Sequence, residues 1–393
     1  MTKKALIIGG GIAGPVTAMA LQRAGLDVEV FEAYDRGSEG VGAFLTIAVN
    51  GLEALRVLDL REQVAALGMD SPRMVIVNGR GRRLATLTQP SRTVKRSDLY
   101  RTLRDEAVRR GVRVTYGRRL TDASITGDGV RAVFADGSEA EGDLLVGADG
   151  LRSRTRALID PGAPRARHVG LLNTGGFATG VTVPGEPGTS YFVFGRRCFF
   201  GYLIHPDGQV WWFANPPSPR EPTREELAAI TPAQWRVRLE ELFRDDTGPM
   251  LDIVRATGDI PPAWNTYDFP SVPRWFNERM VIVGDAAHAT SPSAGQGASM
   301  AIEDAVTLGR CLRDVPVPRE AFAAFERLRR ERVERVVAQG RRNGSGKAPG
   351  VAGAFVRDLA LPVIMRYAMK PGAMSWLYDH RISWDEPVPA PAH

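Results

Sequence analysis

Cysteine is almost absent from this chain of 393 residues. Its two cysteines, Cys198 and Cys311, lie more than a hundred positions apart, so they form neither a CxxC redox motif nor a zinc-binding pair. A disulfide-stapled fold and the disulfide-exchanging oxidoreductases are therefore excluded. From this composition we expect a reducing, cytoplasmic location.

Long apolar runs are also missing. The apolar run at residues 5–9 is too short for the core of a secretion signal. The most apolar late stretch, residues 351–378, is interrupted by four charged side chains, so it falls short of the roughly 18–20 apolar residues of a membrane-spanning helix. We expect no stable membrane insertion and interpret this stretch as a packed helical region.

Lysine is nearly as scarce, because only five of the 51 basic residues are lysines and the rest are arginines. Against 45 acidic residues this leaves a net charge of +6, a mild excess that is compatible with nucleic acid, with acidic ligands or with no particular partner. The densest charge run, residues 320–339, is typical of one long helix with a buried apolar side. Because its arginines alternate with glutamates, we interpret the charges as a solvated face and expect no nucleic-acid partner.

The length and the remaining composition are those of an ordinary globular protein. Hydrophobic residues make up 44% of the chain and charged residues 24%. A chain of this length is expected to form about two packed domains.

The first fifty residues contain a glycine motif between two strands. Residues 5–8 are typical of a strand buried on both faces, and a helix ending near Gly25 and a second strand, 28–31, follow. Between strand and helix, Gly9, Gly11 and Gly14 satisfy GxGxxG, which allows a tight turn, close approach of a pyrophosphate and close helix packing. Glu32 ends the second strand, where a carboxylate accepts hydrogen bonds from a ribose. This context favours a site for FAD or NAD.

Two further strands each deliver an acidic residue to a turn. The first, residues 143–148, leads to Asp149-Gly150, with Ser153 and Arg156 following at helical spacing. The second, residues 280–283, leads to Gly284-Asp285 and then to a glycine-rich segment that begins a helix.

Together the three motifs resemble the single-component FAD-dependent monooxygenases of the para-hydroxybenzoate hydroxylase type (class A). The resemblance covers residues 1 to about 345, and the segment GDAAHATSPSAGQGASMAIEDAV is its most specific part. It implies non-covalent FAD, with Glu32 on the adenosine ribose, Asp285 on the ribityl chain and Arg96 on the flavin. It also implies a backbone contact of Leu120 near the adenine, and a link from Asp149 to both FAD and the nicotinamide cofactor.

The same resemblance gives the set of residues expected to bind FAD. Pro292 would place its carbonyl near the reactive flavin carbon, and the amides of Gly297 and Ala298 at a helix start would stabilise negative charge on the reduced flavin. The expected set is Gly9, Gly11, Ile12, Ala13, Gly14, Glu32, Gly42, Arg96, Leu120, Asp149, Asp285, Pro292, Gly295, Gly297 and Ala298.

The reaction implied by the resemblance is oxygen transfer. NADPH or NADH would reduce FAD, and O₂ would form a flavin C4a-hydroperoxide that hydroxylates or epoxidises an aromatic, polycyclic or olefinic small molecule. The alternative is an FAD-containing oxidoreductase or cyclase on the same fold without oxygen transfer. No catalytic acid or base and no metal site is assigned, and the chain is expected to be a monomer or homodimer.

The other glycine pairs in the chain do not complete a second GxGxxG. This argues against reductases with two dinucleotide domains, and a nicotinamide cofactor would bind transiently. No WxWxIP motif is present, which argues against a flavin halogenase.

The predicted fold is α/β: a Rossmann-like FAD-binding domain, an interleaved antiparallel-sheet substrate domain and a C-terminal helical region. The FAD domain is expected to be discontinuous, at residues 1–71, 96–165 and 271–345. The sheet domain would comprise 72–95 and 166–270, and the helical region and tail 346–393.

Aromatic strands dominate the predicted sheet domain. Runs at 189–194, 198–204 and 209–214, with turn residues between them, predict an antiparallel meander. Alternation places Phe192 and Phe194 on one face and Tyr191 and Val193 on the other. Which face meets a substrate is left open, and four polar residues are possible lining groups although a structural role is favoured for each: His205, Tyr202, Arg197 and Asn173.

Two residues near the third motif have structural alternatives to a functional role. The alternative for Asp285 is a helix N-cap. His288 is interpreted as a core histidine, because the sequence shows no partner for acid–base work.

Overall fold

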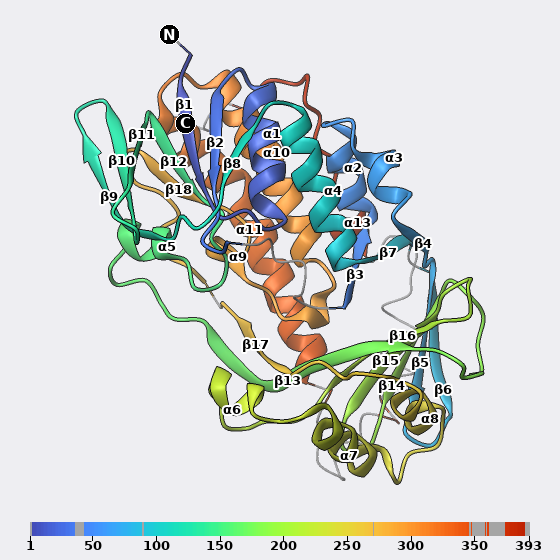
Figure 1. Cartoon of the computed structure of the whole chain (residues 1–393). Coiled ribbons are helices and arrows are strands. Elements are labelled where there is room, and N and C mark those ends of the chain that lie inside the picture. Colours follow the sequence, from blue (N-terminus) through green and yellow to red (C-terminus); the bar gives the residue numbers. More distant parts are fainter. Residues whose placement is uncertain are drawn as a thin grey trace.

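The computed structural model of the chain describes residues 2–35, 43–88, 90–269, 271–345 and 374–389, and the single residues 347, 358 and 360. Gly42 and most of the predicted C-terminal helical region lie outside these residues. A parallel sheet with helices packed along it forms one part of the molecule, and a larger sheet forms the other (Figure 1).

The parallel sheet has five strands in the order β18-β12-β1-β2-β8. Its strands are rich in branched apolar residues and nearly all buried, because α1 (Ala13–Arg23) covers one face and β10 (Gly129–Phe134) and β11 (Glu139–Gly142) contact β12 and β1 on the other. The bounds are β1 (Lys4–Ile8), β2 (Asp27–Phe31), β8 (Arg113–Thr115), β12 (Leu144–Gly147) and β18 (Met280–Ile282). Because β1, β12 and β18 are adjacent and parallel, the three motifs that follow them meet at one edge of the sheet.

Helices α1 and α10 pack against each other beside this sheet. Their approach is close at Gly309, where a Cβ would lie 2.9 Å from the carbonyl oxygen of Ala20. Helix α11 lies along α10 and extends to the larger sheet (Figure 1), where Arg341 bonds Asp268. The helices of this part are α1 (Ala13–Arg23), α2 (Val49–Arg56), α3 (Arg61–Ala65), α4 (Arg96–Arg109), α5 (Arg154–Ile159), α9 (Asp285–His288), η1 (Pro292–Ala294), α10 (Gly297–Asp314), α11 (Pro318–Ser345) and α13 (Ser375–Tyr378).

The larger sheet has seven strands in the order β17-β13-β16-β15-β14-β5-β6. Strands β14, β15 and β16 form the predicted antiparallel meander, and β5 joins β14 in parallel. The strands are β5 (Arg73–Asn78), β6 (Arg83–Thr88), β13 (Arg167–Ala178), β14 (Thr189–Phe194), β15 (Phe199–Ile204), β16 (Val210–Asn215) and β17 (Trp264–Asp268).

Three short helices follow β16. Helices α6 (Arg224–Ala228) and α7 (Pro232–Phe243) both begin with a capping box, in which a threonine and the glutamate or glutamine three residues later bond each other's backbone. Helix α7 and α8 (Met250–Arg255) bury one face of the seven-stranded sheet.

Two three-stranded sheets complete the fold. One has the order β11-β10-β9, from β9 (Leu120–Thr126), β10 (Gly129–Phe134) and β11 (Glu139–Gly142). The other has the order β3-β7-β4, from β3 (Phe44–Ala48), β4 (Gly68–Asp70) and β7 (Ser91–Lys95). The predicted segment 72–95 thus supplies strands to two sheets, and the predicted domain boundaries stay a prediction.

The α/β fold predicted from the sequence is confirmed in its parallel sheet, its larger mainly antiparallel sheet and the helices that follow. Among the described residues, no helix is both long enough and apolar enough to span a membrane.

Candidate active site

The loops after β1, β12 and β18 are fastened to one another by backbone hydrogen bonds. The amide of Gly9 donates to Phe31 O at 2.8 Å, and that of Ala148 donates to Ile8 O at 2.8 Å. The amide of Val283 donates to Gly147 O at 3.0 Å. The residues predicted from three distant motifs therefore share one edge of the sheet, where open α/β sheets bind their ligands.

The three motif glycines have different reasons to be glycine. Gly9 has a φ of +104°, and a Cβ there would lie 2.4 Å from Ala148 O. A Cβ on Gly14 would lie 1.9 Å from Gly9 O, so that position serves the packing of α1 against the turn. A Cβ on Gly11 would meet no atom within 4 Å. Gly11 therefore faces open space at the start of α1, where free amides suit a pyrophosphate.

Glu32 follows β2 and is buried beside the glycine turn. One carboxylate oxygen accepts a hydrogen bond from the amide of Gly10 at 2.6 Å, and the other accepts one from the amide of Tyr34 at 3.0 Å. These bonds fix the carboxylate at the end of the strand, where it was predicted to meet a ribose.

Asp149 is engaged by the start of α5. Its carboxylate accepts hydrogen bonds from Ser153 Oγ at 2.5 Å and from the amide and hydroxyl of Thr155 at 3.0 Å each. Ser153 in turn caps α5 by accepting from the amide of Arg156 at 2.9 Å. Asp149 thus shapes the turn after β12, and its predicted contact with FAD stays a prediction.

Arg156 joins the second motif to the third. Its guanidinium donates to Leu151 O at 2.9 Å and to Ala286 O at 3.0 Å, and it lies 4.4 Å from the ring centre of Phe269. The sequence showed Arg156 at helical spacing but did not indicate this link, which depends on β12 and β18 being neighbours.

Asp285 and Arg96 face each other across the site. Asp285 is the first residue of α9, whose N-cap is Gly284, so it is not the N-cap that was the structural alternative. Burial among protein atoms raises the pKa of Asp285, and the charges of His288 and Arg96 oppose that shift. Burial likewise lowers the pKa of Arg96, and Asp285 opposes it. Neither side chain forms a hydrogen bond or ion pair with the part of the chain that the structure describes, so both are available to a ligand.

The segment after α9 presents a helix start to the same edge. Gly295, with a φ of +61°, closes the turn η1 that begins at Pro292, and α10 begins at Gly297 as predicted. The first amides of an α-helix have no partner within the helix, so those of Gly297 and Ala298 suit a negatively charged ligand.

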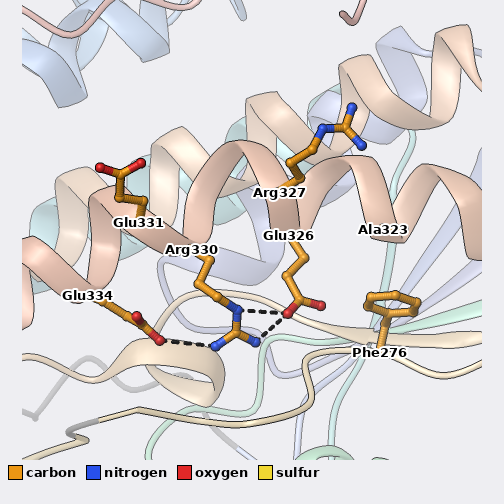
Figure 2. Close-up of a pocket in the computed structure, with 7 residues that line it drawn as sticks. All are labelled: Phe276, Ala323, Glu326, Arg327, Arg330, Glu331 and Glu334. Carbon is orange, nitrogen blue, oxygen red and sulfur yellow. Dashed lines mark hydrogen bonds and ion pairs between the residues drawn. The ribbon is translucent and has the colours of Figure 1, made fainter. Parts of the chain in front are cut away.

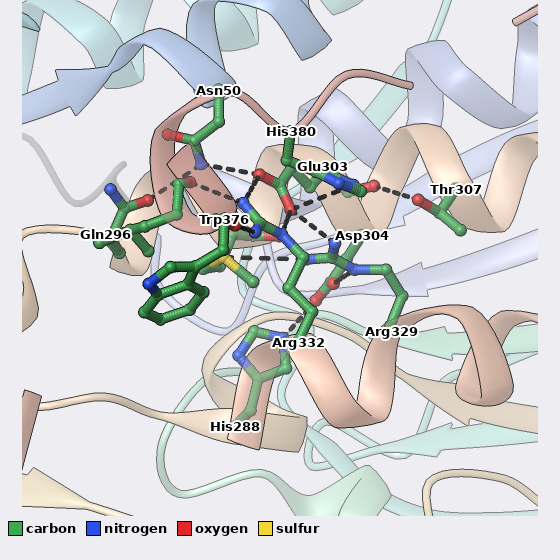
Figure 3. Close-up of polar contacts among 12 residues, drawn as sticks. Asn50, His288, Gln296, Glu303, Asp304, Thr307, Arg329, Arg332, Trp376 and His380 are labelled. Carbon is green, nitrogen blue, oxygen red and sulfur yellow. Dashed lines mark hydrogen bonds and ion pairs between the residues drawn. The ribbon is translucent and has the colours of Figure 1, made fainter. Parts of the chain in front are cut away.

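A buried polar network supports both flanks of this helix start (Figure 3). Asp304 of α10 accepts a hydrogen bond from the amide of Gly284 at 2.9 Å and pairs with His288 Nε2 at 2.5 Å. Asn50 donates to Gln296 Oε1 at 3.0 Å and to Glu303 Oε1 at 2.7 Å. The network therefore holds the residues just before Asp285 and just before Gly297.

Two arginines of α11 balance the two buried acids of α10. Arg329 donates to Asp304 at 2.8 Å and to Glu303 at 2.5 Å, and Arg332 makes two bonds of 2.8 Å with Glu303. Arg332 also donates to Trp376 O and so fastens α13 to this core. Burial alone would raise the pKa of both acids, but the facing cations lower it to about 2 in each.

The interpretation of the charges in α11 as a solvated face is therefore wrong for these two arginines. Arg329 is 1% exposed, because the buried carboxylates of α10 require cationic partners. The apolar side of the helix is placed as predicted, with Phe322, Phe325, Val333 and Val336 buried. A local pattern cannot tell such an arginine from a surface arginine.

His288 is a buried core histidine, as interpreted from the sequence, and Asp304 is its partner. Its bond to Asp304 orders the turn behind Asp285.

The polar residues considered as pocket groups are placed on different sides of the larger sheet. Tyr202 donates to Pro184 O on the face covered by α7 and α8, and Arg197 pairs with Glu241 and Asp245 of the α7 region. His205 stacks on Trp211, with the ring centres 5.1 Å apart.

The remaining predicted residues lie at the starts of α1 and β9. Ile12 is the N-cap of α1 and Ala13 its first residue, and Leu120 begins β9 and is buried.

A surface hollow on the outer side of α11 is not part of this edge (Figure 2). Arg330 at its centre already bonds Glu326 at 2.8 Å and Glu334 at 3.0 Å. Its lining residues are Phe276, Ala323, Glu326, Arg327, Arg330, Glu331 and Glu334.

The geometry fits a dinucleotide site. The glycine turn suits a pyrophosphate, an acid and an arginine lie nearby, and the start of α10 suits the negatively charged edge of a bound ring. Comparison with known proteins agrees with this class. Residues 2–339 match the family described as FAD binding domain, and the chain belongs to that family.

The chain is similar over most of its length to several curated proteins and solved structures. The FAD-dependent urate hydroxylase of Klebsiella pneumoniae is 30% identical over 86% of this chain and 89% of its own. The 3-amino-4-hydroxybenzoate 2-monooxygenase of Streptomyces cremeus is 30% identical over 95% and 94%. The crystal structure of Klebsiella pneumoniae HpxO complexed with FAD and uric acid superposes with a TM-score of 0.83 at 25% identity, over 95% of this chain and 97% of that one.

The chain is thus an FAD-dependent monooxygenase of the hydroxylase family, with FAD as cofactor and NAD(P)H as the reductant typical of its class.

Proposed function

We propose that this enzyme uses NAD(P)H and O₂ to hydroxylate or epoxidise an aromatic, polycyclic or olefinic small molecule. The single observation that carries the proposal is that the charges of Asp285 and Arg96 act on each other while neither side chain bonds any of the described residues. Relatives named for the hydroxylation of urate and of an aminohydroxybenzoate support an aromatic substrate.

The residues at the sheet edge fit FAD. The open space at Gly11 and the first amides of α1 would hold the pyrophosphate, and Glu32 would accept hydrogen bonds from the adenosine ribose. Asp285 would bind the ribityl chain and Arg96 the flavin ring. When bound, FAD would accept two electrons from the nicotinamide and allow transfer of one oxygen atom from O₂ to the substrate.

The chain's own residues contribute binding, charge and exclusion of water. The amides of Gly297 and Ala298 would stabilise negative charge at the ring edge without rearranging. The aromatic side chains of the larger sheet would hold a flat substrate and keep water from the reacting atoms.

Reconstitution of the purified protein with FAD tests the proposal. The protein is expected to be yellow, to consume NAD(P)H faster when an aromatic substrate is added, and to incorporate labelled oxygen from O₂ into the product. Substrate conversion without labelled oxygen in the product would instead support an oxidoreductase or cyclase on this fold, and protein that cannot retain FAD would contradict the proposal.

Asp285→Asn tests the site itself. Loss of a charged acceptor is expected to weaken FAD binding about tenfold to a hundredfold, as measured by calorimetric titration of the apoprotein. The apoprotein should melt no lower, because burial raises the pKa of Asp285 and its charge is not stabilised by the fold. The matched control is Asp128→Asn in the exposed turn between β9 and β10, which should leave FAD affinity unchanged.

A further inference from the structure

The face of the seven-stranded sheet opposite α7 and α8 carries a cluster of phenylalanines. Phe199 of β15 lies 5.5 Å from Phe192 of β14 and 5.9 Å from Phe213 of β16, measured between ring centres. Phe192 and Phe194 both contact Phe199, as the predicted alternation requires, whereas Tyr191 stacks on Tyr202 on the helix-covered face. Phe192 and Phe213 remain only half-buried, so this aromatic face is the one left to a substrate.

A lysine lies on this aromatic face. The Nζ of Lys347 is 4.1 Å from the ring centre of Phe199 and 5.7 Å from that of Phe213, and the residue is 6% exposed. Within the described part of the chain, its amine donates a hydrogen bond to Asn215 Oδ1 at 2.7 Å. Across the described ranges of the chain, no carboxylate pairs with Lys347.

The amide of Asn215 is oriented to meet this amine. Its Nδ2 donates to Leu172 O at 3.2 Å and to Asn173 Oδ1 at 3.0 Å, which leaves Oδ1 toward Lys347. Asn173, considered from the sequence as a pocket residue, therefore acts through Asn215.

Lys347 also lies next to the turn that precedes α10. The last turn of α11 approaches η1, where Asn343 donates to Ser293 O at 3.2 Å and a Cβ on Gly344 would lie 3.4 Å from Ser293 Oγ. The amide of Lys347 then bonds Gly344 O at 3.1 Å. The backbone of Lys347 thus lies near the turn containing Pro292, while its amine lies over the phenylalanines.

A buried ammonium without a counter-charge is unfavourable unless something pairs with it. An ammonium has three donors, and Asn215 accepts only one. Burial lowers the pKa of Lys347 to about 7, and a bound anion would raise it again. Structural lysines of this kind normally have a carboxylate partner, so the missing partner suits an acidic ligand.

We propose that Lys347 anchors an acidic oxygen, carboxylate or phenolate, of an aromatic substrate whose ring packs on Phe192 and Phe213, the half-buried rings of this face. This inference rests on the proposed function, because it names the substrate class of the same site. Lys347 then selects acidic aromatics over neutral ones of the same shape and sets the position of the ring relative to Pro292.

Ligand binding to the FAD-loaded enzyme tests the inference separately from turnover. The probes are benzoate, 4-nitrophenol and neutral benzamide, and the readout is the change in flavin absorbance. The wild type is expected to bind at least one acidic probe about tenfold or more tightly than benzamide. Lys347→Met should remove that preference and leave benzamide affinity within about threefold, while Lys347→Arg should retain it.

A control variant, and outcomes that separate failure of this inference from failure of the proposed function, complete the experiment. Lys3→Met, before the amino end of β1, should bind all three probes as the wild type does. The inference is overturned if the wild type shows no preference for an acidic probe, or if Lys347→Met keeps one. Failure of the wild type to retain FAD or to consume NAD(P)H with any aromatic would instead count against the proposed function. Preference for benzoate or for 4-nitrophenol identifies the acidic oxygen.

The pH dependence of binding keeps the test decisive if Lys347→Met does not fold. The other titratable group that acts on Lys347 is Cys198, whose pKa burial raises, so its thiol stays neutral. Benzoate affinity of the wild type should therefore fall as the pH rises through about 7, and Lys347→Arg should abolish the fall. A fall that persists in Lys347→Arg would contradict the inference.

Discussion

At the scale of single residues, Gly14 and Gly11 of the GxGxxG motif are glycines for different physical reasons. Gly14 is required by the protein, because a side chain there would collide with Gly9 O at 1.9 Å. A side chain on Gly11 would meet no protein atom within 4 Å, so we expect a bound ligand, and not the protein, to require glycine there. The sequence pattern GxGxxG predicts both but does not separate them by physical cause.

Alanine substitutions distinguish the two glycines. Gly14→Ala is expected to lower the free energy of unfolding of the apoprotein by at least about 2 kcal/mol, because backbone must shift. Gly11→Ala is expected to leave that free energy within about 1 kcal/mol and to weaken FAD binding about tenfold or more.

Denaturant unfolding of the apoprotein and FAD titration check both values. Gly258→Ala is the control, because a Cβ there would meet no atom within 4 Å. It should change neither the free energy of unfolding nor the FAD affinity. A Gly11→Ala protein with full FAD affinity would contradict the assigned role of the glycine turn.

At the scale of elements, α10 and α11 form one electrostatic unit. Helix α10 brings Glu303 and Asp304 into the interior, and α11 supplies Arg329 and Arg332. The pairing also fixes the two segments that frame the site, through Gly284 and Asn50. We therefore regard the four charged residues as positioning residues.

Removal of Arg329 should be strongly destabilising. Arg329→Met leaves two buried carboxylates short of a partner, and the free energy of unfolding is expected to fall by about 3–5 kcal/mol. FAD affinity should fall with it, since the start of α10 loses its support.

Arg327→Met on the exposed side of the same helix is the control, with an expected change within about 0.5 kcal/mol. Both variants are measured by urea unfolding. Equal destabilisation by Arg329→Met and Arg327→Met would show that the buried ion pairs of Arg329 do not contribute more to stability than an exposed arginine does.

At the scale of the whole molecule, buried ionisable groups make stability depend on pH. The pKa of Glu303 and of Asp304 is lowered to about 2, so their contribution is present above their ordinary pKa values and is lost as the pH falls toward 2. Burial lowers the pKa of His380 to about 4, so the unfolded chain binds that proton first and stability falls between pH 6.5 and about 4. All three residues therefore make the free energy of unfolding fall as the pH is lowered.

The melting temperature is therefore expected to fall continuously from about pH 6.5 downward. Glu303→Gln should melt below the wild type at pH 7, and the difference should shrink as the pH approaches 2, where Glu303 itself becomes neutral. Glu331→Gln, on the exposed side of α11, should show no such convergence. A constant difference for Glu303→Gln across the range would contradict the lowered pKa of Glu303.

The sequence by itself determined the strand, turn and helix pattern around Gly9, the acids after two later strands, the aromatic meander and the family. These features are local, because the alternation of apolar residues and the placement of glycine depend on neighbours in the chain. The same alternation placed Phe192 and Phe194 together on one face, although it did not decide which face the helices leave open.

Only the tertiary structure decided which charged residues are buried and what they meet. Arg329 and Arg332 had the sequence pattern of a surface helix, and Lys347 had no pattern at all. Arg329 and Lys347 are nonetheless buried, and all three bond residues far away in the chain. The free energy of burying a charge depends on its partners, and those partners are set by the packing of α11 against α10 and the larger sheet. The scarcity of cysteine and lysine was visible in the sequence at once, but the position of Lys347 over Phe199 was not.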